Sequence, residues 1–191
     1  LLRDNGVEVV VASGIADVER AARPATLILV AQSQYLTDPL LDELARAPGD
    51  LLLVEPTART REALLPGVRK APAPKSFDSS PDCTLREAER AGAVRFGPSD
   101  SYRAADGRTV TSCYGGVLIR FRAHGRAVTV VGSAEFMTNG GLLRTGNAAL
   151  AMNLAGDRPR LIWYAPQHTE GENSSTTSLF GMIPPNATWL V

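Results

Sequence analysis

Long apolar runs that alternate with short helical patterns fill the first third of the chain, and this alternation constrains the fold most. Continuous aliphatic and β-branched runs are typical of strands buried on both faces. Three such runs lie at residues 7–13, 25–32 and 50–56. The segments between them have helical spacing, and the second offers Thr37 or Asp38 as an N-cap. Strands joined by helices in this way predict a parallel sheet with right-handed crossovers.

The middle of the chain predicts an antiparallel insertion. Strand-like residues flank Asp106-Gly107, a turn sequence that favours a β-hairpin, which we place at about residues 83–116. Residues 117–123 alternate between apolar and polar side chains, as an edge strand or an exposed-face strand does. Residues 126–131 are almost wholly apolar and therefore predict a central strand.

The last third predicts a helix, a strand and a tail. A small-residue helix ends at Gly156 and has Thr145 or Asn147 as its candidate cap. The apolar run RLIWYAP then predicts the final strand. We predict one doubly wound, mostly parallel α/β domain of the flavodoxin-like kind over residues 1–170, followed by an extended tail over 171–191.

Charge and hydropathy argue against nucleic-acid binding and suggest that the chain lies next to a membrane. The 20 basic and 20 acidic residues balance to a net charge of +0, so the chain lacks the field that would attract nucleic acid. Within the chain, no apolar stretch reaches the roughly 20 residues needed to span a bilayer. The sequence IPPNATWLV becomes apolar from Trp189 onward, and a tryptophan beside an apolar run is typical of the water boundary of a membrane helix. We expect a soluble piece followed by a transmembrane helix; a loop that simply ends there is the alternative.

Cys83 and Cys113 are the two cysteines of the chain. With His124 and His168 as the only histidines, none at zinc-like spacing, a metal site is not predicted. We predict a disulfide between the two cysteines, which would close a loop of about thirty residues and place the domain in an oxidising compartment. Two alternatives stay open, namely a reactive Cys83 before a helical pattern and a pair of unpaired thiols.

Polar residues follow the predicted parallel strands, and the carboxyl ends of such strands share one rim. The candidate rim residues are Gln32, Glu55, Ser133, Glu135, Asn139 and His168. A serine, a carboxylate and an imidazole at one rim would suit a hydrolase or transferase using Ser133, Glu135 and His168. Against this, the nucleophile elbow G-x-S-x-G, a phosphate loop and a strand-end cysteine are all missing. A weaker possibility is a small polar ligand held by Gln32, Ser133 and Asn139.

The segment VTVVGSAEFMTNGGLLRTGNAALAMNLAGDRPRLIWYAP, residues 128–166, resembles the actinobacterial domain-of-unknown-function 4350 family. The segment LILVAQSQYLTDPLLDEL and the spacing of the two cysteines are similar to it as well. That family in turn resembles the class I glutamine-amidotransferase-like superfamily and auxiliary subunits of gliding-type ABC transporters, without their catalytic triad. The resemblance implies a membrane protein whose soluble domain lies between two transmembrane helices, outside the cytoplasmic membrane.

These observations together predict a non-catalytic, extracytoplasmic domain that serves as a binding or scaffold module in a membrane complex. We expect other proteins of that complex as partners and flanking helices as the link to the cell membrane. No cofactor, metal or catalytic residue is predicted, and the sequence names no small-molecule ligand.

Overall fold

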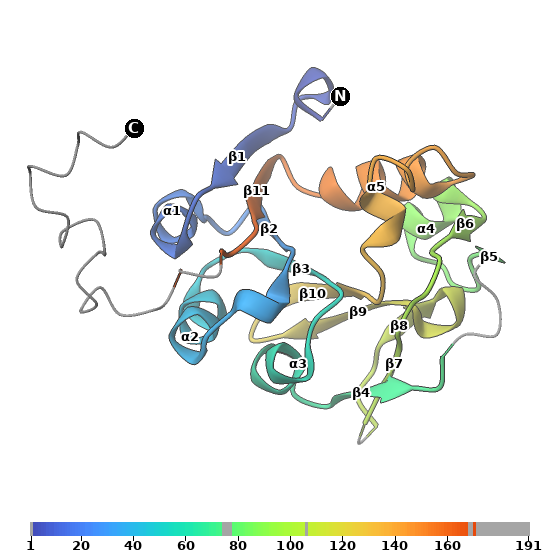
Figure 1. Ribbon diagram of the computed structural model, residues 1–191, viewed down its shortest axis with the longest axis horizontal. Helices are drawn as coiled ribbons and strands as arrows, with labels where there is room; N and C mark the ends of the chain where they lie inside the picture. Colours follow the sequence, from blue (N-terminus) through green and yellow to red (C-terminus); the bar gives the residue numbers. More distant parts are fainter. Residues whose placement is uncertain (1, 74–77, 106, 168–169, 171–191) are drawn as a thin grey trace, which may run out of the picture.

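A seven-stranded sheet forms the centre of the computed structural model, which describes residues 2–73, 78–105, 107–167 and 170. Its strand order is β1-β11-β2-β3-β10-β9-β8 (Figure 1). The five parallel strands are β1 (Glu8–Ala12), β2 (Thr26–Val30), β3 (Asp50–Val54), β10 (Arg126–Val131) and β11 (Arg160–Tyr164). The antiparallel strands β9 (Leu118–Ala123) and β8 (Thr111–Cys113) complete one side. The predicted mixed α/β fold with a mostly parallel sheet is confirmed.

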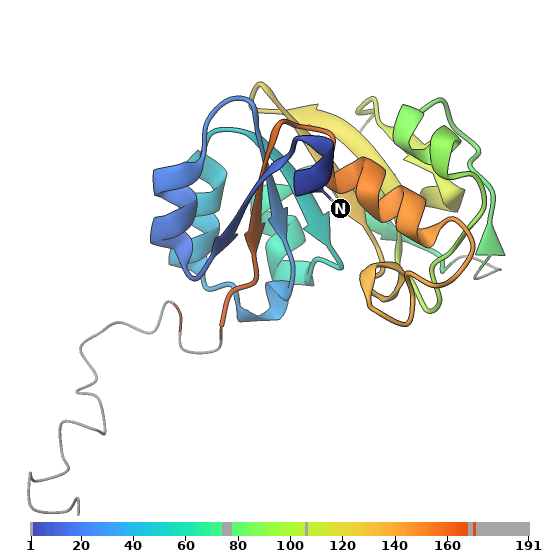
Figure 2. The same cartoon turned by 90° about the horizontal axis from the view of Figure 1, so that it is seen from above.

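Helices cover both faces of this sheet (Figure 2). One face carries α1 (Ile15–Ala21), α2 (Asp38–Arg46) and α3 (Ala58–Leu64), and the other carries α4 (Arg86–Ala91) and α5 (Asn147–Ala155). Two cores result because side chains alternate along a strand. Ile28 of β2 packs into the first core and Leu29 into the second. This double burial explains why the parallel strands read as continuous apolar runs.

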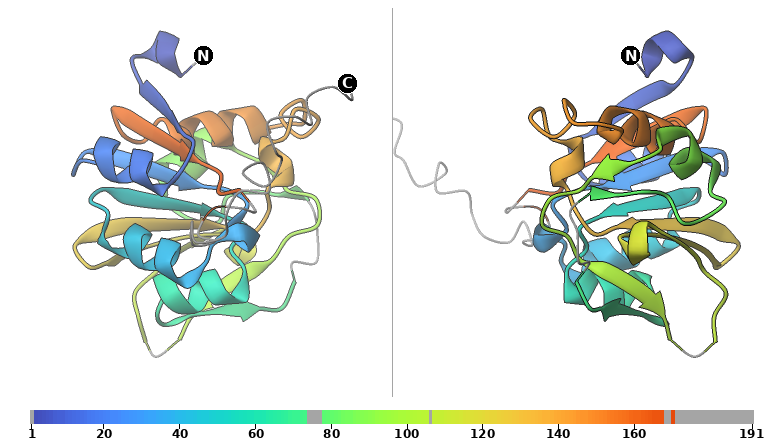
Figure 3. Two further views of the ribbon diagram at one scale, coloured as in Figure 1. Left: turned by 60° about the vertical axis from the view of Figure 1, so that its left-hand side comes forward. Right: turned by 90° about the vertical axis from the view of Figure 1, so that its right-hand side faces the viewer.

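Four short 3₁₀ helices of the described residues lie shortly before or after strands of the sheet. They are η1 (Arg3–Asn5), η2 (Ser33–Tyr35), η3 (Tyr114–Gly116) and η4 (Glu135–Met137). Figure 3 shows the stacked strands of the twisted sheet and the helices packed against them from two further directions. Helix α2 begins after Thr37 as predicted, although the Thr37 side chain makes no capping hydrogen bond.

The hairpin predicted around residues 106–107 does not form. Strand β7 (Ser101–Ala104) pairs with β4 (Val68–Ala71) in a separate ribbon, whereas β8 pairs with β9. A third pair joins β5 (Asp78–Ser79) to β6 (Val94–Arg95). Tyr102 explains the split, because its ring is buried in the core under α1 to α3 and fixes β7 there. A turn sequence alone does not say that the strands beside it pair with each other.

Two further expectations are corrected. Strand β9 is an edge strand only beyond Arg120, because β8 pairs with the outer side of its Leu118–Arg120 half. The N-cap position of α5 is held by Gly146 in the left-handed region, not by Thr145 or Asn147. Asn147 is fully buried instead, where its amide accepts a hydrogen bond from the Arg95 backbone N–H and donates to the Gly141 carbonyl. This amide fastens the loop between η4 and α5 to β6.

Candidate functional site

The connections of the parallel strands identify where a doubly wound sheet would bind a ligand. At their carboxyl ends, β1, β2 and β3 lead to helices on one face, whereas β10 leads to α5 on the other. Strands β3 and β10 are neighbours, so the chain leaves them toward opposite faces. Such a topological switch point opens a crevice beyond the strand ends, and ligands of open α/β sheets bind there.

A hollow of about 320 Å³ lies at this end of the sheet. Its apolar side is formed by Leu29 of β2, Val54 of β3 and the half-buried Trp163 of β11. Its rim carries the polar side chains of Gln32, Gln34, Glu55 and Thr138. An apolar floor with a few polar groups around it is the usual composition of a small-molecule site.

Gln32 and Glu55 both adopt left-handed backbone conformations, with φ values of 54° and 51°. Side chains other than glycine pay about 1–2 kcal/mol for this region. The two residues follow adjacent strands and line the same hollow. Backbone strain of this kind gathers at functional sites, where the surrounding structure enforces it. Among the described non-glycine residues just after a parallel strand, only Gln32 and Glu55 carry this strain. Tyr114 and His124 carry it after the antiparallel strands β8 and β9.

Ser33 enforces the geometry of the rim. Its buried hydroxyl donates to the Glu55 carbonyl over 3.2 Å and accepts from the Thr57 backbone N–H over 3.0 Å. The Glu55 backbone N–H donates to the carbonyl of Val131 in β10 over 2.7 Å. The loops after β2 and β3 and the end of β10 are thus joined by hydrogen bonds directly beneath the exposed side chains.

The predicted rim residues divide into two groups. Gln32 and Glu55 line the hollow, whereas Ser133 is buried and its hydroxyl donates to the Phe96 carbonyl over 2.7 Å. The carboxylate of Glu135 lies against Gly97 and 3.8 Å from a guanidinium nitrogen of Arg144. Ser133 and Glu135 meet only through the Glu135 backbone N–H, which donates to the Ser133 hydroxyl over 3.1 Å.

The other two predicted rim residues are Asn139 and His168. Asn139 is exposed in the loop before α5 and is not among the residues that line the hollow. His168 lies outside the described residues. Over the described ranges, no group of three or more His, Cys, Asp or Glu side chains is placed to hold a metal ion.

Trp163, Met137 and Thr138 line the hollow but were not among the sequence-predicted rim residues. The signal for Trp163 is present in RLIWYAP, because Trp163 shares a face with Leu161 and stands two positions before Ala165. A side chain there lies in the floor of the hollow, whereas the predicted rim residues all follow the strand ends in the sequence. Met137 and Thr138 depend on the path of η4, for which the sequence offers no signal.

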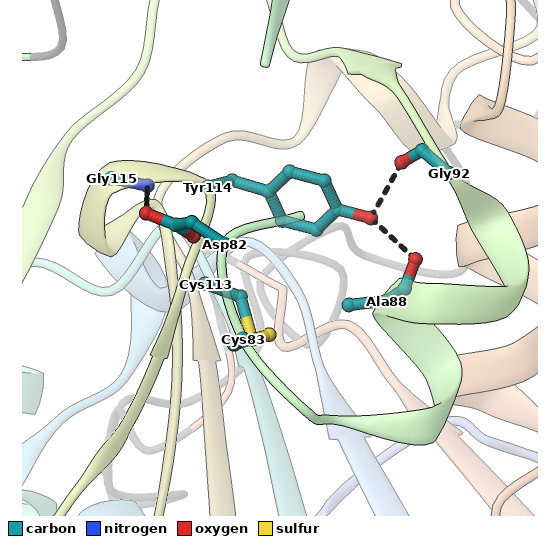
Figure 4. Close-up of a disulfide and its surroundings, with 7 residues drawn as sticks. All are labelled: Asp82, Cys83, Ala88, Gly92, Cys113, Tyr114 and Gly115. Atoms are coloured by element: carbon teal, nitrogen blue, oxygen red, sulfur yellow. Dashed lines mark hydrogen bonds between the residues drawn. A yellow bond between two sulfur atoms is a disulfide. The ribbon is translucent and has the colours of Figure 1, made fainter. Parts of the chain in front are cut away.

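Cys83 and Cys113 form the predicted disulfide, with their Cα atoms 5.1 Å apart (Figure 4). The bond ties the loop before α4 to the end of β8. Next to it, the Tyr114 hydroxyl lies 3.0 Å from the carbonyl oxygens of Ala88 and Gly92, to which it donates (Figure 4). Since both sulfurs are bonded to each other, neither a reactive Cys83 nor a pair of free thiols is present.

Comparison with known proteins gives one family and one long relative. The profile of the family described as Domain of unknown function (DUF4350) matches residues 1–155. The Uncharacterized membrane protein Rv3691 of Mycobacterium tuberculosis is 66% identical over 192 residues, which is 100% of this chain and 50% of the relative. The chain therefore spans about half the length of this relative. No helix of the described ranges is long and apolar enough to cross a membrane.

Solved structures are similar to this chain at a lower level. One of them is the exo-beta-1,4-mannosidase Op5Man5 from Opitutaceae bacterium strain TAV5, at 18% identity and a TM-score of 0.47. The match covers 69% of this chain and 25% of the mannosidase. A likeness of this size supports no statement about fold or activity.

Proposed function

The chain belongs to the family described as Domain of unknown function (DUF4350), and from that premise we propose that it is the extracytoplasmic, non-catalytic binding module of a membrane protein. The relative of twice its length is a membrane protein. In this proposal the remaining half of the full-length protein supplies the membrane helices, and the module contributes to a membrane complex through what it binds. The sheet would then be the amidotransferase-like variant of the flavodoxin-like fold, without a catalytic triad.

The disulfide supports the extracytoplasmic side. Cytosolic reductants keep thiols reduced, whereas disulfides form and persist outside the cytoplasmic membrane. Cys113 is fully buried and its partner Cys83 is half-buried, so the bond is a part of the core rather than an exposed redox group.

The hollow at the switch point is the observation that carries the binding function. Its rim is strained at Gln32 and Glu55, it is braced by Ser33, and it has an aromatic floor. Glu55 is the one charged side chain that lines it among the described residues. We therefore expect a neutral or positively charged ligand with an apolar face that packs on Trp163; a cation over the indole would also gain cation–π attraction. Anionic compounds would be repelled.

Ser133 supports binding rather than catalysis. A serine nucleophile needs a free hydroxyl beside a base. The Ser133 hydroxyl is buried and committed to a carbonyl acceptor and a backbone donor. Ser133 does not line the hollow, whereas Glu55 does, and its carboxylate can bind a ligand.

Trp163 provides the test of binding. The chain has two tryptophans, so Trp189→Phe leaves Trp163 as the only one. We expect its fluorescence to respond to members of a panel of neutral sugars and small amines, and to no carboxylic acid of similar size. Glu55→Ala should abolish the response to amines, and Asp38→Ala, an exposed carboxylate on α2, should leave it unchanged. A response to carboxylic acids alone, or to no compound at all, would contradict the proposal.

Cysteine labelling tests the location. An exposed cysteine introduced at Asn139 in the full-length protein should react with a membrane-impermeant maleimide in intact cells, and the unsubstituted protein corrects for any other thiol. Labelling that requires cell lysis would place the module in the cytoplasm and overturn the proposed side.

A further inference from the structure

A second hollow, of about 850 Å³, lies beside β9 and carries charge of the opposite sign. It forms because β8 pairs with β9 only up to Arg120, so the rest of β9 borders the segment before β8 rather than a strand. Four arginines line it, namely Arg108, Arg120, Arg122 and Arg158, and no acidic side chain of the described ranges does. Since β9 runs antiparallel to β10, its Arg120–Ala123 half lies at the amino ends of β3 and β10, opposite the switch point.

Two of these arginines are fixed by buried carboxylates beneath them. Arg120 lies 2.9 Å from a carboxylate oxygen of Glu87 and 3.4 Å from one of Asp157. Arg158 lies 2.5 Å from a carboxylate oxygen of Asp50. These contacts hold the two guanidinium groups in place and neutralise most of their charge.

The other two arginines lack a carboxylate partner among the described residues. The Arg108 guanidinium stacks on the Phe121 ring, 5.6 Å from its centroid. Arg122 donates one hydrogen bond to the Gly125 carbonyl over 2.7 Å. Both groups keep further N–H donors free for a ligand, because a guanidinium has five. Among the described residues, four guanidinium groups and three carboxyl groups leave the hollow with surplus positive charge.

We propose that this hollow binds a phosphate-bearing anion through Arg108 and Arg122. A guanidinium fork donates two parallel hydrogen bonds to a phosphate or carboxylate. The hydroxyls of Thr109 and Thr111 line the same hollow and can donate to a further oxygen, which favours the three oxygens of a phosphate group over the two of a carboxylate. Inorganic phosphates and phospholipid headgroups share this chemistry.

Calorimetric titration with sodium pyrophosphate tests the site in the 191-residue chain. We expect measurable binding at low salt that weakens as salt is added. The double variant Arg108→Gln/Arg122→Gln should weaken it at least tenfold. Arg59→Gln, which removes an exposed arginine on α3, is the matched control and should bind as the unsubstituted chain does. The thermal midpoint of each variant shows whether it is folded.

Vesicles distinguish the two sources of the phosphate. Binding to phosphatidylglycerol vesicles, absent with phosphatidylcholine vesicles and lost in the double variant, would assign the hollow to a lipid headgroup. Binding of pyrophosphate with no vesicle binding would assign it to a free phosphate compound. The proposal fails if pyrophosphate does not bind, or if the double variant and Arg59→Gln weaken binding equally. Neither result bears on the hollow at the switch point, because the two sites share no residue.

Discussion

The hydroxyl of Ser33 donates to the carbonyl oxygen of Glu55 over 3.2 Å and so joins the loops that follow two adjacent strands. It also accepts from the Thr57 backbone N–H, the residue that caps α3. One buried hydroxyl thus sets the backbone position of Glu55, whose exposed side chain lines the hollow. The rim is organised from beneath by a residue that a ligand would never touch.

Ser33→Ala should therefore loosen the rim and destabilise the fold. The substitution leaves the partly buried Thr57 N–H without its acceptor, which costs about 1–3 kcal/mol of the free energy of unfolding. Urea denaturation measures this loss. Gln34→Ala, one residue away and exposed, is the control and should stay within about 0.5 kcal/mol of the unsubstituted chain. Equal stability of the two variants would mean that the Ser33 hydroxyl carries no structural role.

Glycine at position 55 should stabilise the chain while damaging the site. The φ of 51° at Glu55 is strained for a side chain and accessible to glycine. We expect Glu55→Gly to raise the free energy of unfolding by about 0.5–1 kcal/mol. Ala149→Gly, at an exposed position of α5, should lower it by about 1 kcal/mol. Destabilisation by both substitutions would show that the Glu55 side chain contributes more to stability than the strain costs.

Reduction of the disulfide should destabilise the fold without any change of sequence. The bond closes a loop between residues 30 apart in the chain. In the chain-entropy model, opening a loop of that length costs about 3–4 kcal/mol. Urea denaturation with and without a phosphine reductant measures the difference. The variant Cys83→Ser/Cys113→Ser is the control, since the reductant should have no effect on it.

Two buried tyrosines should respond in opposite ways to loss of the hydroxyl. Tyr114 donates to backbone carbonyls, so Tyr114→Phe should lower the free energy of unfolding by about 1–2 kcal/mol. The Tyr102 hydroxyl is buried without a partner among the described residues, so Tyr102→Phe should be neutral or stabilising by about 1 kcal/mol. Thermal denaturation of both variants compares them directly. A loss in Tyr102→Phe as large as that in Tyr114→Phe would reveal a hydrogen-bond partner.

The sequence predicts the parallel half of the sheet well, for a physical reason. Strands buried on both faces must be apolar at almost every position. The runs DLLLVEP and ATLILVAQ therefore predict buried strands strongly. Their carboxyl ends then follow from topology, and Gln32 and Glu55 were found in this way. The disulfide follows from the number of cysteines, because two in a chain without metal-site spacing leave few alternatives.

The antiparallel half is less predictable because its pairings depend on distant partners. Nothing near Tyr102 says that β7 pairs with β4, some thirty residues earlier, rather than across the nearby turn. The hydroxyl of Ser133 presents a similar difficulty. Its partner is the carbonyl of Phe96, which only tertiary packing brings close. The backbone strain at the rim is likewise invisible in the sequence, since neither Gln32 nor Glu55 is a residue type that favours positive φ.

Glu87 and Asp157 form a buried acidic pair beneath Arg120, and their pKa values move in opposite directions. Burial raises the pKa of Asp157, and its hydrogen bond to Glu87 raises that pKa further. Burial acts on the pKa of Glu87 in the same direction, but the hydrogen bond from Asp157 and the Arg120 charge lower it overall. The pair therefore keeps a proton on Asp157 at a pH where the unfolded chain has released it.

This pair should make stability depend on pH with opposite signs at its two members. Asp157 binds its proton more tightly when folded, so its contribution falls as pH rises from its ordinary pKa of 3.8 to its folded pKa. Asp157→Asn removes this fall, and its stability relative to the unsubstituted chain should increase from about pH 4 toward neutral pH. Glu87 contributes stability above its ordinary pKa of 4.5 that is lost as pH falls through its lowered folded pKa. The stability of Glu87→Gln relative to the unsubstituted chain should therefore fall as pH rises from the lowered folded pKa of Glu87 to its ordinary pKa of 4.5.

Urea denaturation of the three chains between pH 3 and 7 measures these differences. Only the slope with pH matters, because each substitution also changes contacts with Arg120 by an amount independent of pH. Asp42→Asn, an exposed carboxylate on α2, is the control and should follow the unsubstituted chain at every pH. Parallel curves for Asp157→Asn and Glu87→Gln would contradict the opposite shifts of the two pKa values, because those shifts require the two stability differences to change in opposite directions as pH rises.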